Sequence, residues 1–561
     1  MNKQWEICSV DEELVDKISE KLKIGKLVSK IIANKGLKSL EEMEKFLDPT
    51  RFDFHDPFLM PDMDKAVNRI IQAINNNEKT IIYGDYDVDG ITSSTILKRY
   101  LEERGLHTEI YIPNRLDEGY GLNKNAIQEI SKENYKLIIT VDCGITGNVE
   151  VDLANELGMD VIVTDHHETT EILPNAIAVV DAKRKDNKYP FRGLAGVGVT
   201  FKTIQAISKR LELPDETYLK YLDIVCIGTI SDIVPLEDEN RVISKLGLKL
   251  IKQTRNIGLK ELLESIGYKQ IDSNTISFGI APRINACGRI GYEKEAVELF
   301  LTNEKAEAKR ITNELNKYNL ERQEIEKNIF CEAVDMVKNS NEPCIVIGKE
   351  NWHHGVIGIV ASKITEMYSK PSILLCYEDG IAKGSGRSIK GFDLHAALEI
   401  CDTYIEQFGG HSMAIGVTIK KENVDKFKQQ FQEYAKKQNI QDIIPVINID
   451  DKINLKDICI QDVKDLKLLE PFGEANPMPL FQINNVKIEA IRALSEGKHL
   501  KMLLKDENNK YIDVIGFNMG NLSEEYKIGS KIDVVGTLEI NSYKGMENIQ
   551  LNLKYIRHKI A

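Results

Sequence analysis

Strand-like and helix-like patterns alternate from about residue 60 to 235. Short apolar, β-branched runs at 80–83, 107–112, 137–141, 160–164 and 176–180 predict buried strands. Amphipathic stretches at 91–103, 124–131 and 148–157 predict helices between them. This alternation is typical of an α/β fold in which helices cover both faces of a mostly parallel sheet.

Different patterns follow on either side of this region. Residues 1–50 show the apolar spacing of short helices, with Leu27, Ile31, Ile32 and Leu37 on one face. Apolar residues at three- and four-residue steps predict one long helix between 303 and 339. A second α/β segment is expected at 343–450. Short β runs from about 455 predict a small antiparallel barrel.

Composition limits the class of protein. A chain of 561 residues, 42% hydrophobic and 29% charged, is expected to form two to four globular domains. The nine cysteines form no Cys-x-x-Cys pair, and the N-terminus has no apolar leader, so we expect a cytoplasmic protein. No apolar segment is long enough for a membrane span. The net charge of −13 argues against a nucleic-acid binder, although charge can be local.

The first candidate for chemistry is Gly84-Asp85-Tyr86-Asp87-Val88-Asp89-Gly90. Its three carboxylates fall where a strand ends and a helix begins, which is where ligands bind in open α/β sheets. Crowded carboxylates repel one another unless a cation neutralises them, and oxygen ligands suit Mg²⁺ or Mn²⁺. A solvated acidic turn is the alternative. An EF-hand loop starting at Asp85 is not expected, because Ile96 occupies the position of its closing glutamate.

Similar polar groups follow three more apolar runs. Asp142 follows 137–141, Asp165-His166-His167 follows 160–164, and Asp232 follows 227–231. If each run is a parallel strand, these side chains meet at one edge of the sheet. Histidine adds a nitrogen ligand, which favours Mn²⁺ and does not exclude Zn²⁺.

These motifs resemble those of the DHH phosphoesterase superfamily and, within it, the RecJ family of bacterial single-strand-specific 5′→3′ exonucleases. The resemblance continues through most of the chain. Further matching stretches are 194–198, 228–236, 282–289, 352–360, 384–388, 409–411 and 469–473. Cys287, Ser231 and Ala475 depart from the family pattern, none of them at a ligand position.

The resemblance implies roles for individual residues. The metal ligands for two Mn²⁺ or Mg²⁺ ions are expected to be Asp87, Asp89, Asp142, His166 and Asp232. Asp85, as a support for the second ion, and His167, as a donor to the scissile phosphate, are the expected catalytic residues. The expected substrate-binding residues are Arg283, Asn285, Arg289, Ser385, Arg387, Gly409, Gly410 and His411. The last five lie in glycine-rich stretches that we predict to be turns.

The resemblance also implies a domain order. We expect a helical segment at 1–50, a DHH domain at 51–302, a connecting helix at 303–342, a DHHA1 domain at 343–454 and an OB-fold at 455–561. An OB-fold binds single strands through aromatic and basic groups. The candidates here are Phe481, Tyr511, Phe517, Tyr543, Lys498, His499, Lys501, Lys505 and Lys544.

Three functions are compatible with the sequence. The main prediction is a metal-dependent exonuclease that degrades single-stranded DNA from its 5′ end in DNA repair and recombination. The first alternative is a DHH phosphodiesterase for short oligonucleotides, cyclic dinucleotides or polyphosphate, and the second is a non-catalytic replication scaffold. The retained acids argue against the scaffold, and the C-terminal barrel argues against the small-substrate enzyme. Single-stranded DNA is the expected partner, with a single-strand-binding protein and a helicase as candidates.

Overall fold

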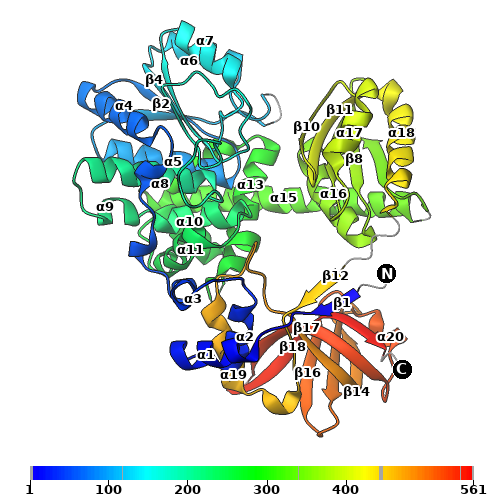
Figure 1. The fold of residues 1–561 in the computed structure, drawn as a ribbon. Coiled ribbons are helices and arrows are strands. Elements are labelled where there is room, and N and C mark those ends of the chain that lie inside the picture. The colour runs from blue at the N-terminus through cyan, green and yellow to red at the C-terminus, as the bar shows by residue number, and fades with distance from the viewer. Residues whose placement is uncertain are drawn as a thin grey trace. The chain divides into compact units, whose positions relative to one another are not determined.

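The computed structural model describes residues 4–115, 118–268, 270–338, 340–440, 446–543 and 545–558. The chain forms two compact units (Figure 1). One, here called the α/β unit, comprises Asp56–Asp232 and Leu250–Pro445. The other, here called the barrel unit, comprises Met1–His55, Ile233–Lys249 and Val446–Ala561.

A five-stranded parallel sheet forms the first part of the α/β unit. Its strand order is β3-β2-β4-β5-β6, which confirms the predicted parallel sheet and all five predicted strands. Helices α6 and α7 share a core with one face, and α5 and α8 pack on the other (Figure 1). The bounds are β2 Thr80–Tyr83, β3 Thr108–Tyr111, β4 Leu137–Val141, β5 Asp160–Thr164, β6 Ala178–Val180, α5 Val88–Glu102, α6 Lys124–Lys132, α7 Asn148–Glu156 and α8 Gly196–Arg210.

One predicted strand end is wrong. The run before Asp232 belongs to helix α10 (Leu222–Ser231), and Asp232 is the residue that caps its C-terminus. Every residue from Leu222 to Ile230 is buried, and all but Asp223, Gly228 and Thr229 are apolar, so this helix has no solvent-exposed face over that range. Its sequence therefore lacks the polar face that distinguishes an amphipathic helix from a buried strand.

Further helices complete this part of the unit, and one of them leads to a second sheet. Helix α15 extends over 33 residues, in agreement with the predicted long helix. The other bounds are α4 Met63–Asn76, α9 Glu216–Leu219, α12 Ile257–Ile266, a π-helix Thr275–Ile280, α13 Ala281–Ile290, α14 Glu293–Leu301 and α15 Lys305–Val337. Helix α11 (Asp238–Ile251) begins in the barrel unit.

The second sheet has the order β10-β11-β9-β8-β7, and only its β7–β8 pair is parallel. Helices α15 and α16 share a core with one face, and α17 and α18 share one with the other. The bounds are β7 Ile345–Glu350, α16 His354–Tyr368, β8 Ser372–Glu378, β9 Ile381–Arg387, α17 Leu394–Ile400, β10 Gln407–His411, β11 Ala414–Lys420 and α18 Val424–Lys437.

The glycine-rich stretches of this sheet are strands, so the predicted turns are wrong. Ser385 and Arg387 lie on β9, and Gly409 to His411 lie on β10. The glycines make room for side chains of neighbouring strands. A Cβ on Gly384 would lie 2.6 Å from Leu375 Cδ2 and 2.8 Å from Val417 Cγ1. Glycine inside a strand marks such a close approach as readily as it marks a turn.

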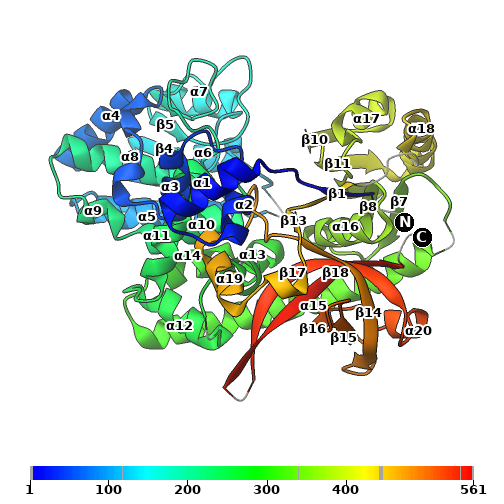
Figure 2. The same ribbon diagram turned by 60° about the horizontal axis from the view of Figure 1, so that its bottom comes forward.

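The barrel unit contains a closed five-stranded barrel, which confirms the predicted β-barrel, although its β16–β18 pair is parallel and not antiparallel as predicted. Its order is β14-β15-β16-β18-β17, and β17 pairs with β14 to close it (Figure 2). Two runs predicted as separate strands form the single strand β14, whose register shifts between Ile483 and Val486. The bounds are β14 Phe481–Leu494, β15 His499–Lys505, β16 Tyr511–Gly516, α20 Leu522–Glu525, β17 Lys531–Tyr543 and β18 Met546–His558.

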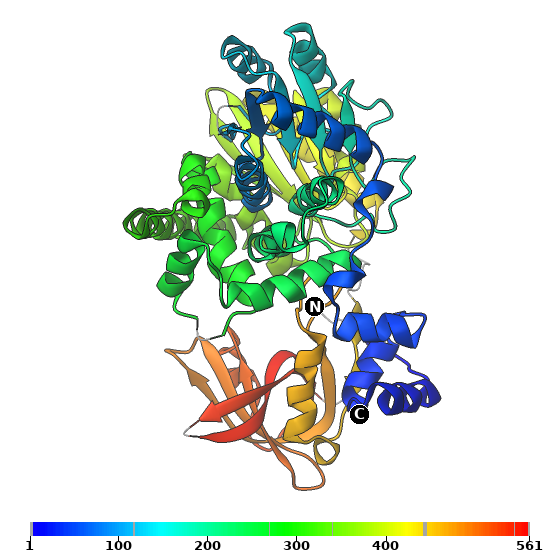
Figure 3. The ribbon, with the colours of Figure 1, turned by 90° about the vertical axis from the view of Figure 1, so that its left-hand side faces the viewer.

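The N-terminal helices pack on this barrel (Figure 3). Ile18, Val28 and Ile32 share a core with Leu469 and Phe481. Strand β1 also pairs in parallel with β12, which leads into the barrel. The bounds are β1 Gln4–Ile7, α1 Glu12–Leu22, α2 Lys26–Ala33, α3 Leu40–Leu47, β12 Val446–Ile449, β13 Asp451–Lys452 and α19 Ile460–Asp465.

The candidate base-stacking residues of the barrel differ in exposure. Phe481 is fully buried, whereas Tyr511 is 55% and Phe517 is 54% exposed. The Tyr543 side chain and Lys544 lie outside the described residues. Two aromatic rings therefore remain available for stacking. Among the described helices, none has the length and apolar character needed to cross a membrane.

Candidate active site

Asp87 and Asp89 are positioned by the start of α5. Asp87 is its N-cap, and Asp87 Oδ1 accepts hydrogen bonds from the amides of Asp89 at 2.8 Å and Gly90 at 3.1 Å. A side-chain oxygen at this position satisfies amides that have no partner within the helix. The motif thus folds as a capped helix start directly after β2.

Asp89 is also held by the N-terminus of α8. Its two carboxylate oxygens accept from the amides of Gly196 and Val197, each at 2.7 Å. The positive end of the α8 dipole favours a carboxylate there. Glycine is required at 196, because a Cβ would lie 2.5 Å from Asp142 Oδ1. The helix start and two acids are consequently packed together.

His166 lies among three carboxylates. Its Nε2 atom is 3.1 Å from Asp142 Oδ1, 3.7 Å from Asp232 Oδ2 and 3.9 Å from Asp89 Oδ2. Asp142 follows β4 with φ of 61°, a left-handed conformation that is uncommon for a residue other than glycine. The structure thus brings Asp232, at a helix end, to the groups at the strand ends.

The carboxylates of this cluster are hard to ionise without a cation. Burial and the charge of Asp87 raise the pKa of Asp89 to about 7. Burial and neighbouring acids raise the pKa of Asp232 to about 9 and hold those of Asp85 and Asp142 well above the usual range. Burial, together with the charge of the neighbouring His167, lowers the pKa of His166 to about 3, so its imidazole is neutral at pH 7.

The cluster fits divalent cations. Asp85 Oδ1 is buried and receives no hydrogen bond, and the buried Asp142 Oδ1 has His166 Nε2 at 3.1 Å but not in hydrogen-bond geometry. Buried oxygens in this state require a partner, and a cation provides one without a proton. Three overlapping sets of side chains have ligand atoms close enough to share an ion: Asp85, Asp87 and Asp142; Asp89, His166 and Asp232; and Asp142, His166 and His167. Carboxylate oxygens with one or two imidazoles suit Mn²⁺ or Mg²⁺.

His167 is oriented by Asp165 and Tyr120. His167 Nδ1 lies 2.7 Å from Asp165 Oδ1, and the Tyr120 hydroxyl is 3.1 Å from the same ring atom. Burial opposes protonation of His167, but the hydrogen bond and charge of Asp165 raise its pKa above 6.5. Sequence reasoning gave no role to Asp165 or Tyr120. Asp165 could have been found from its place beside the two histidines in the motif.

Three arginines lie close enough for their charges to affect one another, and one of them, Arg115, also acts on Asp85 of this cluster. Burial and the charges of Arg115 and Arg387 contribute to lowering the pKa of Arg289 to about 9. Burial and Arg115 also lower the pKa of Arg387. Cations that repel one another in this way are suited to bind an anion such as phosphate. Arg115 was missed by sequence reasoning, although it follows β3 at the same edge of the sheet.

The other predicted substrate-binding residues differ in position. Asn285 Oδ1 accepts from the Val88 amide at 3.2 Å, beside the acidic motif. Arg289 donates to the Gly355 carbonyl at 2.5 Å, and Arg387 donates to Ser385 Oγ at 3.1 Å. Arg283 instead donates to Asn316 and Gly279, at 2.6 and 2.7 Å. Within the described ranges, Gly409, Gly410 and His411 are exposed on β10 and make no side-chain contact with the acids.

Family models match three parts of the chain. The model described as "DHH family, N-terminal domain" matches residues 79–229. The DHHA1 domain model matches 341–437. The RecJ OB domain model matches 449–555. The first match contains the acidic cluster except Asp232, the second contains the second sheet, and the third contains the barrel up to residue 555 of β18.

Complete relatives are similar over almost the whole chain. The single-stranded-DNA-specific exonuclease RecJ of Bacillus subtilis is 40% identical over 98% of this chain and 70% of its own length. The Haemophilus influenzae RecJ is 33% identical over 91% of this chain and 93% of its own length. The structure is also similar to a crystal structure of Thermus thermophilus RecJ in complex with Mn²⁺, with a TM-score of 0.88 and 30% sequence identity. The matched region covers 100% of this chain and 80% of the chain in that structure. The chain therefore belongs to the RecJ family of single-stranded-DNA-specific exonucleases.

Proposed function

We propose that this protein is a metal-dependent exonuclease that hydrolyses single-stranded DNA from its 5′ end. One observation carries the proposal: buried carboxylates with unpartnered oxygens lie beside mutually repelling arginines, in a chain of the RecJ family. Such a site suits two divalent cations and a phosphate. The T. thermophilus relative was solved with Mn²⁺ and with Mg²⁺, which supports either ion as the cofactor.

The acids and one histidine would hold the cations. We assign Asp87, Asp89, Asp142, His166 and Asp232 as ligands, and Asp85 as the support of the second ion. When bound, the cations supply positive charge for the phosphodiester oxygens and activate a water molecule for hydrolysis. Backbone amides and the burial described above fix the acids before substrate arrives, so little reorganisation is needed.

His167 would act on the scissile phosphate. Asp165 fixes the imidazole and raises its pKa, so the ring carries a proton to a higher pH than an isolated histidine. A protonated ring can donate a hydrogen bond to an oxygen on which negative charge develops. The Tyr120 hydroxyl, 3.1 Å from Nδ1, contacts the same ring.

The arginines would hold the terminal phosphate. We assign Arg115, Arg289 and Arg387 to this task, because their mutual repulsion falls when a phosphate binds between them. A phosphate fixed there would set the 5′→3′ direction by placing the first internucleotide bond at the acids. Ser385, Gly409, Gly410 and His411 are proposed to complete this site, and Arg283 and Asn285 to steady the strand.

The barrel would grip the strand. It lies within the region matched by the RecJ OB domain model, and Tyr511 and Phe517 expose their rings for base stacking. A small-substrate phosphodiesterase has no evident use for such a module, and a scaffold has none for the acid cluster. We also propose that the chain divides into the five segments named above, which end at residues 50, 302, 342, 454 and 561.

The cellular setting is also a proposal. The resemblance to the RecJ family favours DNA repair and recombination in the cytoplasm as the context. A helicase would supply single strands, and a single-strand-binding protein would cover them. Pull-down of each purified candidate with the full chain tests these partnerships.

Loss of the ligand Asp142 tests the proposed chemistry. Asp142→Ala should abolish hydrolysis of single-stranded DNA and leave the thermal transition in place. Asp152→Ala, which removes an exposed acid on α7, is the matched control and should retain activity. Full activity of Asp142→Ala, or activity that survives thorough chelation, would refute the metal-dependent mechanism.

A further inference from the structure

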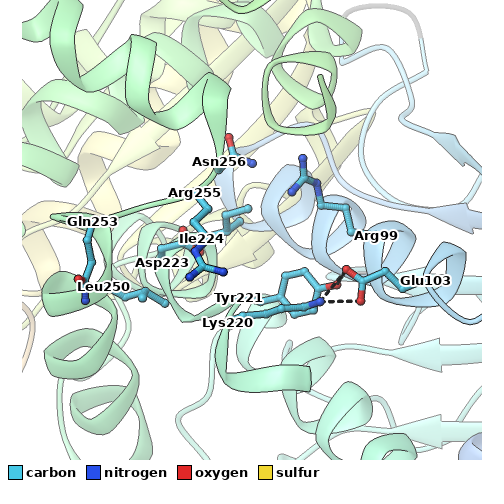
Figure 4. Close-up of a pocket in the computed structure, with 10 residues that line it drawn as sticks. All are labelled: Arg99, Glu103, Lys220, Tyr221, Asp223, Ile224, Leu250, Gln253, Arg255 and Asn256. Atoms are coloured by element: carbon cyan, nitrogen blue, oxygen red, sulfur yellow. Dashed lines mark hydrogen bonds and ion pairs between the residues drawn. The ribbon is translucent and has the colours of Figure 1, made fainter. Parts of the chain in front are cut away.

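A cavity of about 470 Å³ lies at the far ends of two helices that carry the acid cluster. Helix α5 begins next to Asp87 and has Arg99 and the capping Glu103 at its other end. Helix α10 ends at Asp232 and begins beside the cavity, which Asp223 and Ile224 line. Figure 4 shows Arg99 approaching from α5 and Arg255 from the segment before α12. The cavity is therefore separate from the candidate active site.

Most polar groups of this cavity already have partners. Lys220 Nζ lies 2.6 Å from both Glu103 oxygens. The Asp223 carboxylate accepts from Thr254 Oγ1 at 2.6 Å and from the Ile224 amide at 2.8 Å. Glu103 and Lys220 neutralise each other, whereas the buried Asp223 carboxylate is held by neutral donors and interacts with the charge of Arg99.

Two guanidinium groups are the exception. In the part of the chain that the structure describes, neither Arg99 nor Arg255 has a carboxylate within ion-pair distance. Arg99 makes one long contact, to the Leu301 carbonyl at 3.4 Å. A guanidinium offers a planar fork of donors that matches phosphate oxygens. These two guanidinium groups, neither of which has an ion-pair partner among the described residues, line the same cavity.

The remaining wall suits a flat apolar group. Ile224 and Leu250 line the cavity, and Gln253 adds an amide. A volume of this size lies within the range of small-ligand pockets. We infer that the cavity binds a phosphate monoester of nucleotide size, with Arg99 and Arg255 on the phosphate and the ring against Ile224 and Leu250.

Helices α5 and α10 each extend from the cavity at one end to the acid cluster at the other. Helices α5 and α10 pack so closely at Gly228 that a Cβ there would lie 2.3 Å from Thr92 Oγ1 and 3.1 Å from Asp89 Oδ1. The ligand would nevertheless not compete with a strand at the acids, because it binds at the opposite helix ends. This separation determines the design of the test.

Calorimetric titration of dTMP into the full chain tests the inference. The protein carries Asp142→Ala, which prevents hydrolysis, and is saturated with a 5′-phosphorylated oligonucleotide that occupies the candidate active site. We expect one dTMP to bind per chain. Combining Arg99→Gln with Arg255→Gln should weaken the affinity for dTMP at least about tenfold, which corresponds to a loss of about 1.4 kcal/mol of binding free energy. Lys252→Gln, a nearby exposed charge change outside the lining, should bind like the parent.

Two further arms identify the chemistry that is recognised. Inorganic phosphate should bind at the same site more weakly than dTMP, and thymidine, which lacks the phosphate, should not bind measurably. If the double variant unfolds, Arg255→Gln alone serves, because this exposed residue makes no ion pair in the described structure. No dTMP binding, equal affinity of the arginine variants and the parent, or equal binding of thymidine would overturn the inference.

Discussion

His167 Nδ1 and Asp165 Oδ1 lie 2.7 Å apart, and this contact helps to raise the pKa of the imidazole next to the acid cluster. The same carboxylate oxygen accepts from the His166 amide at 2.7 Å and the His167 amide at 3.2 Å. Asp165 therefore positions both neighbouring histidines without being a candidate ligand itself.

Asp165→Asn should separate positioning from metal binding. The substitution removes the charge that raises the pKa of His167, so the alkaline limb of the rate–pH profile should move to lower pH. We expect turnover to fall by about 10- to 100-fold, as for other residues that support a site. Bound Mn²⁺, measured by elemental analysis, should stay near the parental value. An unchanged pH profile would show that Asp165 has only a structural role.

The two histidines should differ in metal binding. His166→Ala removes an imidazole that lies 3.1 to 3.9 Å from three carboxylates, so it should reduce bound Mn²⁺. His167→Ala should keep the metal and lose turnover, because its proposed partner is the phosphate. Metal analysis of both purified variants decides the assignment, and equal metal content in the two would contradict it.

Stability should depend on pH through the acid cluster. In the folded protein without metal, the pKa of Asp89 is raised to about 7 and that of Asp232 to about 9. These groups therefore lose their protons at a higher pH in the folded state than in the unfolded state. The unfolded state, with carboxyl pKa values near 4, binds fewer protons in this range, so metal-free stability should fall as pH rises. Bound Mg²⁺ removes the repulsion that causes this loss. The increase in Tm caused by Mg²⁺ should therefore grow between about pH 6 and pH 9.

Asp142→Asn is the control for this stability prediction. Because the variant has one carboxylate fewer, Mg²⁺ should raise its Tm by less than it raises the Tm of the parent, and this increase should vary less with pH. Scanning calorimetry with Mg²⁺ and with EDTA gives both numbers. A Mg²⁺ effect that is independent of pH, or equal in the parent and the variant, would argue that the cation binds elsewhere.

Arg387→Ala should weaken recognition of the 5′ end. The parent should degrade a 5′-phosphorylated strand faster than the same strand with a 5′-hydroxyl. The variant should lose most of this preference through a higher KM, because one of the three arginines proposed to hold the phosphate is gone. Lys390→Ala, an exposed charge change three residues away, serves as the matched control. A variant with the full preference for 5′-phosphate would remove Arg387 from the phosphate site.

The sequence predicted the fold best where local pattern and tertiary position agree. The run from Thr80 to Tyr83 is β-branched, buried and followed by a helix cap, and it forms β2 as expected. The segment before Asp232 is equally apolar but lies inside a helix bundle, where a helix has no polar face. Gly384 is a similar case. Glycine is needed there because the side chains of Leu375 and Val417 on neighbouring strands leave no room for a Cβ, and the local sequence does not show which residues those neighbours are.

The site was predicted in part for a similar reason. The acids and histidines stand in dense motifs, so their grouping at one sheet edge could be anticipated. Arg115 and Tyr120 act through residues far away in the sequence, namely Arg289 and His167. Their roles depend on which loops meet in space, and no spacing within the chain encodes that information.

The central claim is tested most directly by digestion of end-labelled DNA. The substrates are a long single strand labelled at its 5′ or its 3′ end, the matching blunt duplex and a dinucleotide, each with Mn²⁺ or with EDTA. The account predicts immediate release of the 5′ label as mononucleotide from the single strand with Mn²⁺, late release of the 3′ label, little digestion of the duplex and no activity with EDTA. Release of the 3′ label first, or a dinucleotide hydrolysed faster than the long strand, would contradict it.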